Sequence, residues 1–164
     1  MKKEDTAVLP DPKWFALLCR LAEENVGSGR GGPFSAMVLK DGELVATAVN
    51  NVLQSGDPTA HAEVNVIREA CRKLNRFQLD DCIILSSCEP CPMCLGAIYW
   101  ARPRAVYYMN TREDAAKIGF DDQFIYDEIL LTPSERKIPF ICIKHDEAAL
   151  AFLEWENKSD KTPY

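Results

Sequence analysis

The sequence predicts an α/β fold, a three-layer α/β/α sandwich around one central five-stranded mixed sheet. An amphipathic helical pattern opens the chain, a strong hairpin signal follows it, and helical and strand patterns then alternate. This order of elements is typical of a single sheet with helices packed on its faces. With 164 residues, of which 47% are apolar, the chain is long enough for one domain with a complete core.

Helices are expected where apolar residues recur at helical spacing. The first covers residues 13–26, where one stripe carries Trp14, Leu17, Leu18, Leu21 and Ala22. The second covers residues 59–74, because Asp57-Pro58 is a capping residue followed by an early proline, a combination typical of helix starts. Shorter helices are expected at residues 92–101, 113–118 and 147–155.

Five strands are expected between or beside these helices. Residues 34–39 and 43–49 predict a hairpin because they flank the turn sequence Lys40-Asp41-Gly42. The glycine-rich residues 27–33 predict a loop, because their spacing fits no phosphate-binding fingerprint. The other three strands are expected at residues 82–87, 105–109 and 138–143.

Two short motifs are the most informative feature of the chain. His61-Ala62-Glu63 is followed further along by Pro90-Cys91-Pro92-Met93-Cys94, and this pattern is the signature of zinc-dependent nucleobase deaminases. Zn²⁺ favours imidazole nitrogen and thiolate sulfur in a tetrahedral shell, so His61, Cys91 and Cys94 are predicted to bind one Zn²⁺. Three protein ligands leave a fourth position for water, which is typical of a catalytic site.

Glu63 lies two residues from His61 and is predicted to be the general acid/base. Zinc lowers the pKa of bound water from about 15.7 to roughly 7, and a nearby carboxylate can then move protons between the water, the ring and the leaving amine. His61 and Glu63 are expected in the first turn of the helix at residues 59–74. Cys91 is expected at the start of the helix at residues 92–101. Two helix N-termini directed at one metal would favour thiolates and negative charge.

Cys88, Cys91 and Cys94 form two overlapping Cys-x-x-Cys pairs, so the sequence also allows other metal sites. An iron–sulfur run would need a fourth nearby cysteine, and residues 95–103 contain none. Because Pro90 directly precedes Cys91, we interpret Cys91 and Cys94 as the ligands and Cys88 as a buried neighbour at a strand end. A structural-zinc module, with four protein ligands and no essential Glu63, stays open as a non-catalytic alternative.

The formal net charge of −6 favours one class of substrate. Proteins that hold nucleic acid need a basic surface, but the basic residues here are interspersed with acids and do not cluster beside the motifs. We therefore expect a small neutral base or nucleoside as substrate, and no nucleic-acid partner. The sequence has neither an apolar run near 18 residues nor a signal-peptide pattern, so no membrane partner is expected. Seven cysteines beside a thiolate–zinc site indicate a reducing, cytoplasmic compartment.

These motifs resemble the cytidine deaminase-like superfamily, and within it nearly the whole chain is similar to bacterial guanine deaminases. The shared core is Asn50-Asn51, residues 57–63 and residues 89–94. This core also resembles bacterial tRNA adenosine deaminases and yeast-type cytosine deaminases, so it does not select the base. Two later features resemble guanine deaminases in particular, the stretch Gly119-Phe120-Asp121-Asp122 and the C-terminal Tyr164.

The resemblance implies the reaction guanine + water → xanthine + ammonia, in purine catabolism or salvage. It implies that Asn50 hydrogen-bonds the purine and that Phe34 stacks on it. It also implies that Asp122 binds the exocyclic amine and assists Glu63 in proton transfer.

The resemblance further implies one domain, residues 1–164, in a domain-swapped homodimer. Residues 157–164 would form an arm that crosses to the partner, where Tyr164 closes the neighbouring active site. Ser35 stands where the family often has glycine, and we expect it to narrow the base pocket or to add a hydroxyl hydrogen bond. Asn65, after Glu63, is expected to be a solvated helix residue.

Several alternatives stay open. A deaminase of the same fold could act on tRNA adenosine, cytosine, guanosine or a triazine such as ammeline. Each proposed pocket residue also has a structural interpretation: Phe34 as a core residue, Asn50 as a strand terminus, and Asp121 or Asp122 as the cap of the following helix. Tyr164 could be a frayed terminus, since chain ends are usually mobile.

Overall fold

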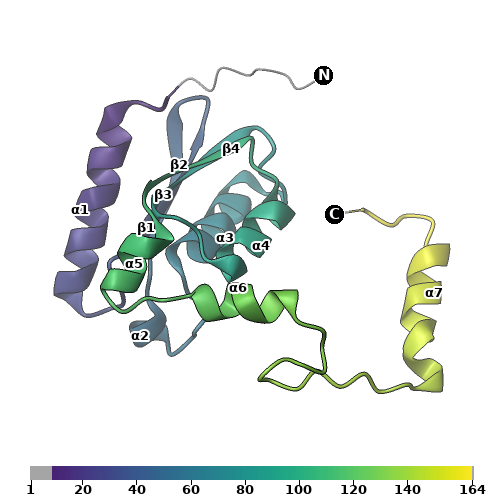
Figure 1. Cartoon of the computed structure of the whole chain (residues 1–164). Helices are drawn as coiled ribbons and strands as arrows, with labels where there is room; N and C mark the ends of the chain where they lie inside the picture. Colours follow the sequence, from purple (N-terminus) through teal and green to yellow (C-terminus); the bar gives the residue numbers. More distant parts are fainter. Residues whose placement is uncertain (1–8, 164) are drawn as a thin grey trace, which may run out of the picture. The chain divides into compact units, whose positions relative to one another are not determined.

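The structure is a computed structural model that describes residues 9–163 (Figure 1). The described residues fold into two compact units, and the division between them falls between Asp122 and Gln123. The first unit contains the sheet and both sequence motifs, so it carries the candidate site. Among the described residues, no helix combines the length and the apolar character that crossing a membrane requires.

The sheet of the first unit has four strands in the order β2-β1-β3-β4. Their bounds are β1 (Ser35–Lys40), β2 (Glu43–Val49), β3 (Cys82–Cys88) and β4 (Ala105–Asn110). β1 runs antiparallel to β2 and β3, whereas β3 and β4 are parallel, so the sheet is mixed as the sequence predicts. The predicted hairpin is also confirmed. Asp41 and Gly42 form its two-residue turn with φ of 51° and 83°, and a turn of this kind needs positive φ at both positions.

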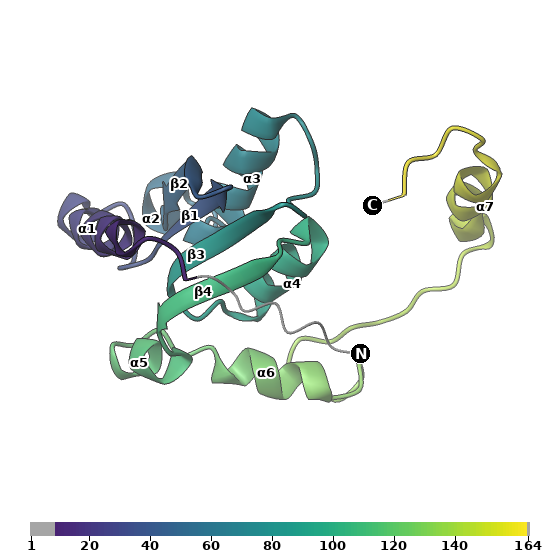
Figure 2. The same ribbon diagram turned by 90° about the horizontal axis from the view of Figure 1, so that it is seen from above.

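Helices cover both faces of this sheet (Figure 2). Met37 of β1 packs with Leu18 of α1 (Pro12–Ser28) in one core cluster. The adjacent Ala36 points to the opposite face, because successive side chains of a strand alternate, and it belongs to a second cluster. That cluster also includes residues of α3 (Ala62–Leu74) and α4 (Pro92–Ala101). The three-layer α/β/α sandwich predicted from the sequence is therefore confirmed.

The helix expected from residue 59 begins at Ala62, so its predicted start was wrong. Asp57 does cap nearby groups, because its Oδ1 accepts hydrogen bonds from the Thr59 N–H at 2.8 Å and the Thr59 hydroxyl at 2.7 Å. These bonds close a local turn instead of starting the helix. A short helix that was not predicted, α2 (Val52–Ser55), precedes this turn. The helix predicted near residue 113 is α5 (Arg112–Lys117).

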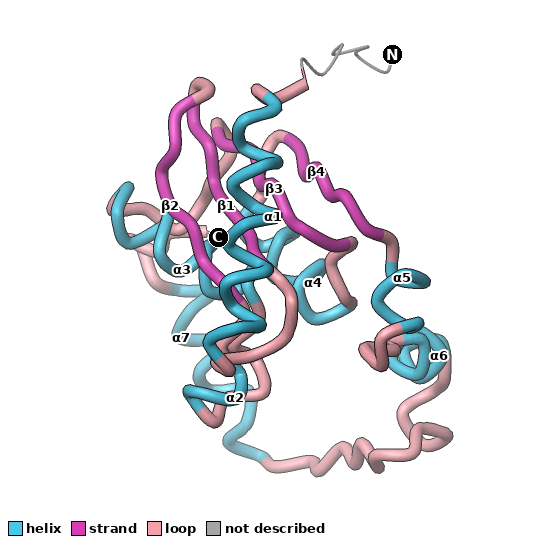
Figure 3. The backbone as a smooth tube through the Cα atoms, turned by 90° about the vertical axis from the view of Figure 1, so that its left-hand side faces the viewer, coloured by secondary structure: helices cyan, strands magenta, loops and turns pink. Residues whose placement is uncertain are grey.

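The second unit contains α6 (Gln123–Leu130), the 3₁₀ helix η1 (Asp146–Ala149) and α7 (Leu150–Asn157). The fifth strand predicted at residues 138–143 is not formed, and this segment is irregular (Figure 3). Ile138 and Ile141 are 73% and 77% exposed. Their β-branched side chains favour extended backbone, but a strand also needs a paired neighbour, which a local pattern cannot supply.

Candidate metal site and base pocket

Two helix N-termini on the same face of the sheet bring the motif residues together. His61 and Cys91 are the N-cap residues of α3 and α4, and neither side chain makes a capping hydrogen bond. Cys94 lies in the first turn of α4 and is fully buried. His61 therefore precedes its helix, although the sequence placed it within the first turn, and Glu63 lies in that turn as predicted.

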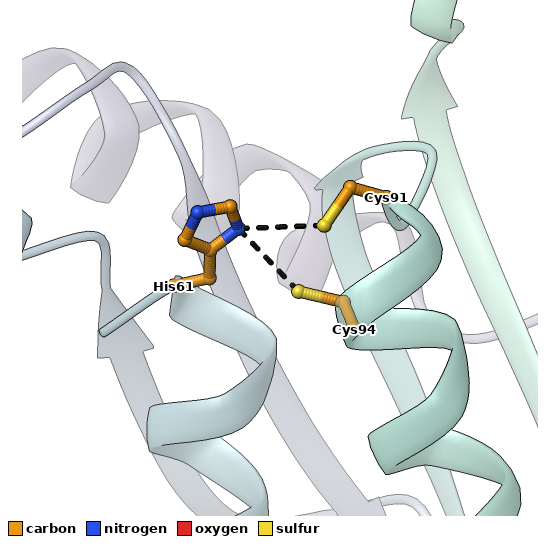
Figure 4. Close-up of side chains that lie close together, drawn as sticks. All are labelled: His61, Cys91 and Cys94. Atoms are coloured by element: carbon orange, nitrogen blue, oxygen red, sulfur yellow. Dashed lines mark hydrogen bonds between the residues drawn. The ribbon is translucent and has the colours of Figure 1, made fainter. Parts of the chain in front are cut away.

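The three side chains converge on one point (Figure 4). The Nδ1 atom of His61 lies 3.6 Å from the Cys91 sulfur and 3.5 Å from the Cys94 sulfur. Their candidate ligand atoms all lie within 4.8 Å of one another. One imidazole nitrogen and two sulfurs are the donor set that Zn²⁺ favours, so the group fits one Zn²⁺.

The protonation chemistry of this group also fits a divalent cation. Hydrogen bonds with Cys94 and His61 lower the pKa of the Cys91 thiol to about 4, which makes Cys91 a thiolate. A hydrogen bond with that sulfur raises the pKa of His61 and also raises the pKa of Cys94. A bound Zn²⁺ would take the place of the protons on His61 and Cys94, because zinc ligands must be deprotonated.

Glu63 lies beside the His61–Cys91–Cys94 group and is only 5% exposed. Its Oε1 accepts a hydrogen bond from the Ser86 hydroxyl at 2.8 Å, and its Oε2 accepts one from the Cys94 thiol at 3.4 Å. Burial raises the pKa of the Glu63 carboxyl group above its ordinary value. A buried carboxylate with a raised pKa suits a group that takes up and releases a proton.

Cys88 lies at the C-terminal end of β3 and outside the His61–Cys91–Cys94 group. Its side chain is buried, and its thiol donates to the Thr111 carbonyl oxygen at 3.5 Å. Burial raises the pKa of this thiol to about 11, so Cys88 is a neutral thiol near neutral pH. These contacts agree with its interpretation as a buried neighbour of the site.

Asn50 and Phe34 are neighbours at the edge of the first unit's core. The Asn50 N–H donates to the Phe34 carbonyl oxygen at 2.9 Å. The Asn50 Oδ1 accepts hydrogen bonds from the backbone N–H groups of Gly32 and Val52, each at 3.3 Å. These bonds orient the side-chain amide of Asn50, so its NH₂ group points away from the two N–H groups that bind its oxygen. The Phe34 ring meets Phe120 edge-to-face, with centroids 4.9 Å apart, so Phe120 is a neighbour that the motifs did not indicate.

Asp122 is partly buried, and the pKa of its carboxyl group is affected by a charge in the metal group. Burial, followed by the charge of Cys91, raises the pKa of Asp122. The influence of Cys91 indicates that this carboxyl group lies in the vicinity of the site. Tyr164, the other residue expected to complete the pocket, lies outside the described residues.

Ser35 points toward α1, so the expected narrowing of the base pocket was wrong, whereas the expected hydroxyl hydrogen bond does form but is made to the backbone of that helix. Its hydroxyl donates to the Leu18 carbonyl oxygen of α1 at 2.7 Å, and its side chain is fully buried. Ser35 therefore lies on the α1 face of the sheet, opposite the face covered by α3 and α4. Strand alternation already indicates this, because Ser35 follows Phe34 directly and must point the other way.

Asn65 and Ser86 are two further polar residues whose roles the motifs did not indicate. The Asn65 amide is not solvated as expected, because it donates to the Ala60 and Val49 carbonyl oxygens and, at 2.8 Å, to the side chain of Asn51. It therefore holds the loop before α3 in place. Ser86 lies in β3 and contacts Glu63 across the interface between the sheet and α3.

The fold and the site define a zinc-dependent hydrolytic enzyme whose buried carboxylate lies beside the metal ligands. A model of the cytidine and deoxycytidylate deaminase zinc-binding region matches residues 10–110, which is more than half of the chain. The chain belongs to this deaminase family. The matched segment includes both motifs, so the family accounts for the zinc site and for the class of reaction.

The chain is also similar to individual proteins whose activities are named. The chain is 56% identical over 144 residues to guanine deaminase from Bacillus subtilis (strain 168), covering 88% of this chain and 92% of that protein. An X-ray structure of guanine deaminase from Bacillus subtilis matches with a TM-score of 0.91 and 51% identity, covering 95% of this chain and 99% of that chain. A tRNA-specific adenosine deaminase from Aquifex aeolicus is 42% identical over 76 residues, covering 46% of this chain and 50% of that protein. Similarity to guanine deaminase thus extends well beyond the part shared with the tRNA enzyme.

Proposed function

We propose that this protein hydrolyses guanine to xanthine and ammonia, in purine catabolism or salvage. The observation that carries the proposal is the similarity to a guanine deaminase over 144 residues. Because the first unit ends at Asp122, a match of that length must extend into the second unit. The similarity therefore covers more than the metal motifs that all deaminases of this family share.

In this proposal, His61, Cys91 and Cys94 hold one Zn²⁺ per subunit. When bound, Zn²⁺ supplies the Lewis-acid chemistry that makes water a nucleophile near neutral pH. A set of three protein ligands is typical of catalytic sites, whereas structural zinc sites have four. The donor set in the structure therefore favours an enzyme over a structural-zinc module.

Glu63 is the proposed general acid/base. It takes a proton from the attacking water while the water oxygen bonds to the ring carbon that carries the amine. Glu63 then returns this proton to the adjacent ring nitrogen. It moves the remaining hydroxyl proton to the amine, which leaves as ammonia while the new carbonyl forms. The raised pKa of the Glu63 carboxyl group supports this role, because the group must hold a proton between the steps.

Phe34, Asn50 and Asp122 are the proposed base-binding residues. Phe34 would stack on the purine, and its contact with Phe120 supports a fixed ring orientation. Asn50 would donate from its NH₂ group to a purine acceptor, because two backbone N–H groups already bind its Oδ1. Asp122 would bind the exocyclic amine and assist ammonia departure, and its electrostatic link to Cys91 supports a place beside the metal group.

We also propose a homodimer in which residues 157–164 cross to the partner and Tyr164 closes the neighbouring site. The apolar surface of α7 supports this proposal, since Leu150, Phe152 and Trp155 are exposed. Exposed apolar side chains of this kind are typical of surfaces that another chain covers. Asn157 is the last residue of α7, so the arm would begin at the end of this helix.

A cytoplasmic location completes the proposal. All seven cysteines lie in the part of the chain that the structure describes and are free of disulfide bonds, and two of them belong to the metal group. Free thiols persist in reducing compartments, where disulfides are rare.

Ammonia release by the zinc-loaded protein tests the proposed substrate. The panel contains guanine, guanosine, adenine, adenosine, cytosine, cytidine and ammeline, with a tRNA substrate assayed separately at several salt concentrations. We expect fast release from guanine and little from the other compounds. Faster release from another base would overturn the guanine proposal and keep the zinc chemistry. No release from any substrate by fully zinc-loaded protein would overturn the enzymatic proposal itself.

A further inference from the structure

We propose that Asn25, a buried residue of α1, is a positioning residue for the base pocket and acts through Asn50. The inference rests on the proposed role of Asn50 in binding the substrate base. Asn25 belongs to neither motif and lies in the C-terminal part of α1, a helix on the opposite side of the sheet from α3 and α4.

The side chain of Asn25 joins three segments of the chain. It is 0% exposed, and its Nδ2 donates one hydrogen bond to the Gly32 carbonyl oxygen at 2.8 Å and another to the Asn50 carbonyl oxygen at 2.7 Å. Both protons of one NH₂ group are therefore used. This single amide therefore links the end of α1 both to the glycine-rich loop and to the residue after β2.

The same loop also contacts the side-chain amide of Asn50, the group proposed to bind the purine. The Gly32 N–H donates to the Asn50 Oδ1 at 3.3 Å, while the Gly32 carbonyl oxygen accepts from Asn25 at 2.8 Å. A Cβ added at Gly31 would lie 2.3 Å from the Asn50 Oδ1, so the loop backbone lies directly against the Asn50 amide. A shift of the loop would therefore move or rotate the group proposed to bind the purine.

The chemistry of the position favours an amide over similar side chains. Two carbonyl oxygens within 2.8 Å of one nitrogen require a donor of two protons. An aspartate would place a carboxylate against these oxygens. An alanine would take the Asn25 donor from both of them, although the Gly32 oxygen would keep its hydrogen bond from the Phe34 N–H at 2.8 Å. The Asn25 Oδ1 is buried with no hydrogen-bond partner among the described residues. The side chain is therefore held by the two hydrogen bonds that its NH₂ group donates, and not by bonds to its oxygen.

The test compares Asn25→Ala with Leu18→Ala in the zinc-loaded full-length protein. Leu18 is a fully buried residue of the same helix that packs against the sheet, so its truncation lowers stability without touching Asn50. We expect Asn25→Ala to raise KM for guanine about tenfold with a smaller change in kcat, as loss of base binding predicts. Zinc content should stay at one per subunit. Leu18→Ala should lower Tm at least as much and leave KM unchanged.

Two further measurements keep the result interpretable. If Asn25→Ala does not fold, Asn25→Ser, which retains one donor, takes its place and should raise KM above the wild-type value, by less than about the tenfold expected for Asn25→Ala. In an Asn50→Ala background, Asn25→Ala should change KM less than about twofold, because residues that act through each other are not additive. An equal rise in KM for Leu18→Ala, or no rise in either Asn25 variant, would overturn the inference.

Ammonia release by the wild-type protein from the substrate panel distinguishes a failure of this inference from a failure of the proposed function. If another base is the faster substrate, the guanine proposal fails, and the same variants are compared with that base. If the wild-type protein deaminates nothing, both the function and the inference are overturned before any variant is made.

Discussion

The hydrogen bond from Ser86 to Glu63 gives the sharpest prediction about catalysis. Ser86 is 1% exposed, and its hydroxyl donates to the Glu63 Oε1 at 2.8 Å. Glu63 is also buried, so little space exists for solvent to replace this bond. Ser86→Ala would leave the Oε1 without this donor and free the carboxylate to rotate away from the metal group.

The magnitude of the effect follows from the kind of bond. A hydrogen bond to a charged, buried group contributes about 1.5–3 kcal/mol. If this energy is needed to hold Glu63 in its reactive orientation, then kcat falls roughly 10- to 150-fold, since about 1.36 kcal/mol corresponds to a factor of ten. KM should change little, because Ser86 contacts Glu63 and not the residues proposed to bind the base.

Steady-state ammonia release, together with the zinc content of each sample, measures this effect. Ser86→Thr is the matched control, because threonine keeps the hydroxyl and should recover most of the activity. A kcat for Ser86→Ala within about threefold of wild type, at full zinc content, would refute the reasoning. So would a threonine variant as slow as the alanine variant.

Three other predictions concern the metal ligands, the general base and the C-terminal arm. Glu63→Gln should retain zinc and lose nearly all turnover, and normal ammonia release from that variant would remove Glu63 from the mechanism. His61→Ala should lose zinc because two sulfurs alone remain, and full metal occupancy by elemental analysis would contradict its assignment as a ligand. Deletion of residues 162–164 should raise KM or lower kcat while zinc stays bound. Unchanged kinetics after this deletion would contradict the proposed closing role of Tyr164.

The parts of the fold that depend on local chemistry were predictable from the sequence. The Asp41-Gly42 turn and the flanking alternation predict the hairpin, because both signals lie within a few residues. The strand expected at residues 138–143 has the same local preference but no paired neighbour, and pairing is a property of the folded chain. The start of α3 was misplaced because Asp57 makes the same kind of bond in a turn as in a helix cap.

The candidate site also has a part that the sequence predicts and a part that it does not. The metal group was predictable because each motif lies at a single helix start: His-x-Glu fixes the spacing of one ligand and the general base, and Cys-x-x-Cys fixes that of the other two ligands. The contacts of Asn25 with Asn50 and of Ser86 with Glu63 join residues 25 and 23 positions apart. No motif marks either pair, since an asparagine or a serine in a chain of 164 residues has many ordinary uses. Such supporting contacts emerge only when the fold brings distant segments together.

The helix caps show how the fold accommodates the metal group. The N-caps of α1 and α5, Asp11 and Thr111, each accept a hydrogen bond from their own helix. The N-caps of α3 and α4 are His61 and Cys91, and their side chains make no such bond. A missing cap costs about 1 kcal/mol of helix stability, so both helices give up a stabilising interaction where the candidate ligands lie. In return, the positive ends of both helix dipoles lie beside the Cys91 thiolate and favour its charge. The N-caps of α2 and α7, Asn51 and Ala149, also make no capping bond, so a missing cap alone does not mark a metal site. What distinguishes α3 and α4 is that their N-cap side chains approach each other to 3.6 Å, with the Cys94 sulfur 3.5 Å from the same imidazole nitrogen, and this geometry supports the metal assignment.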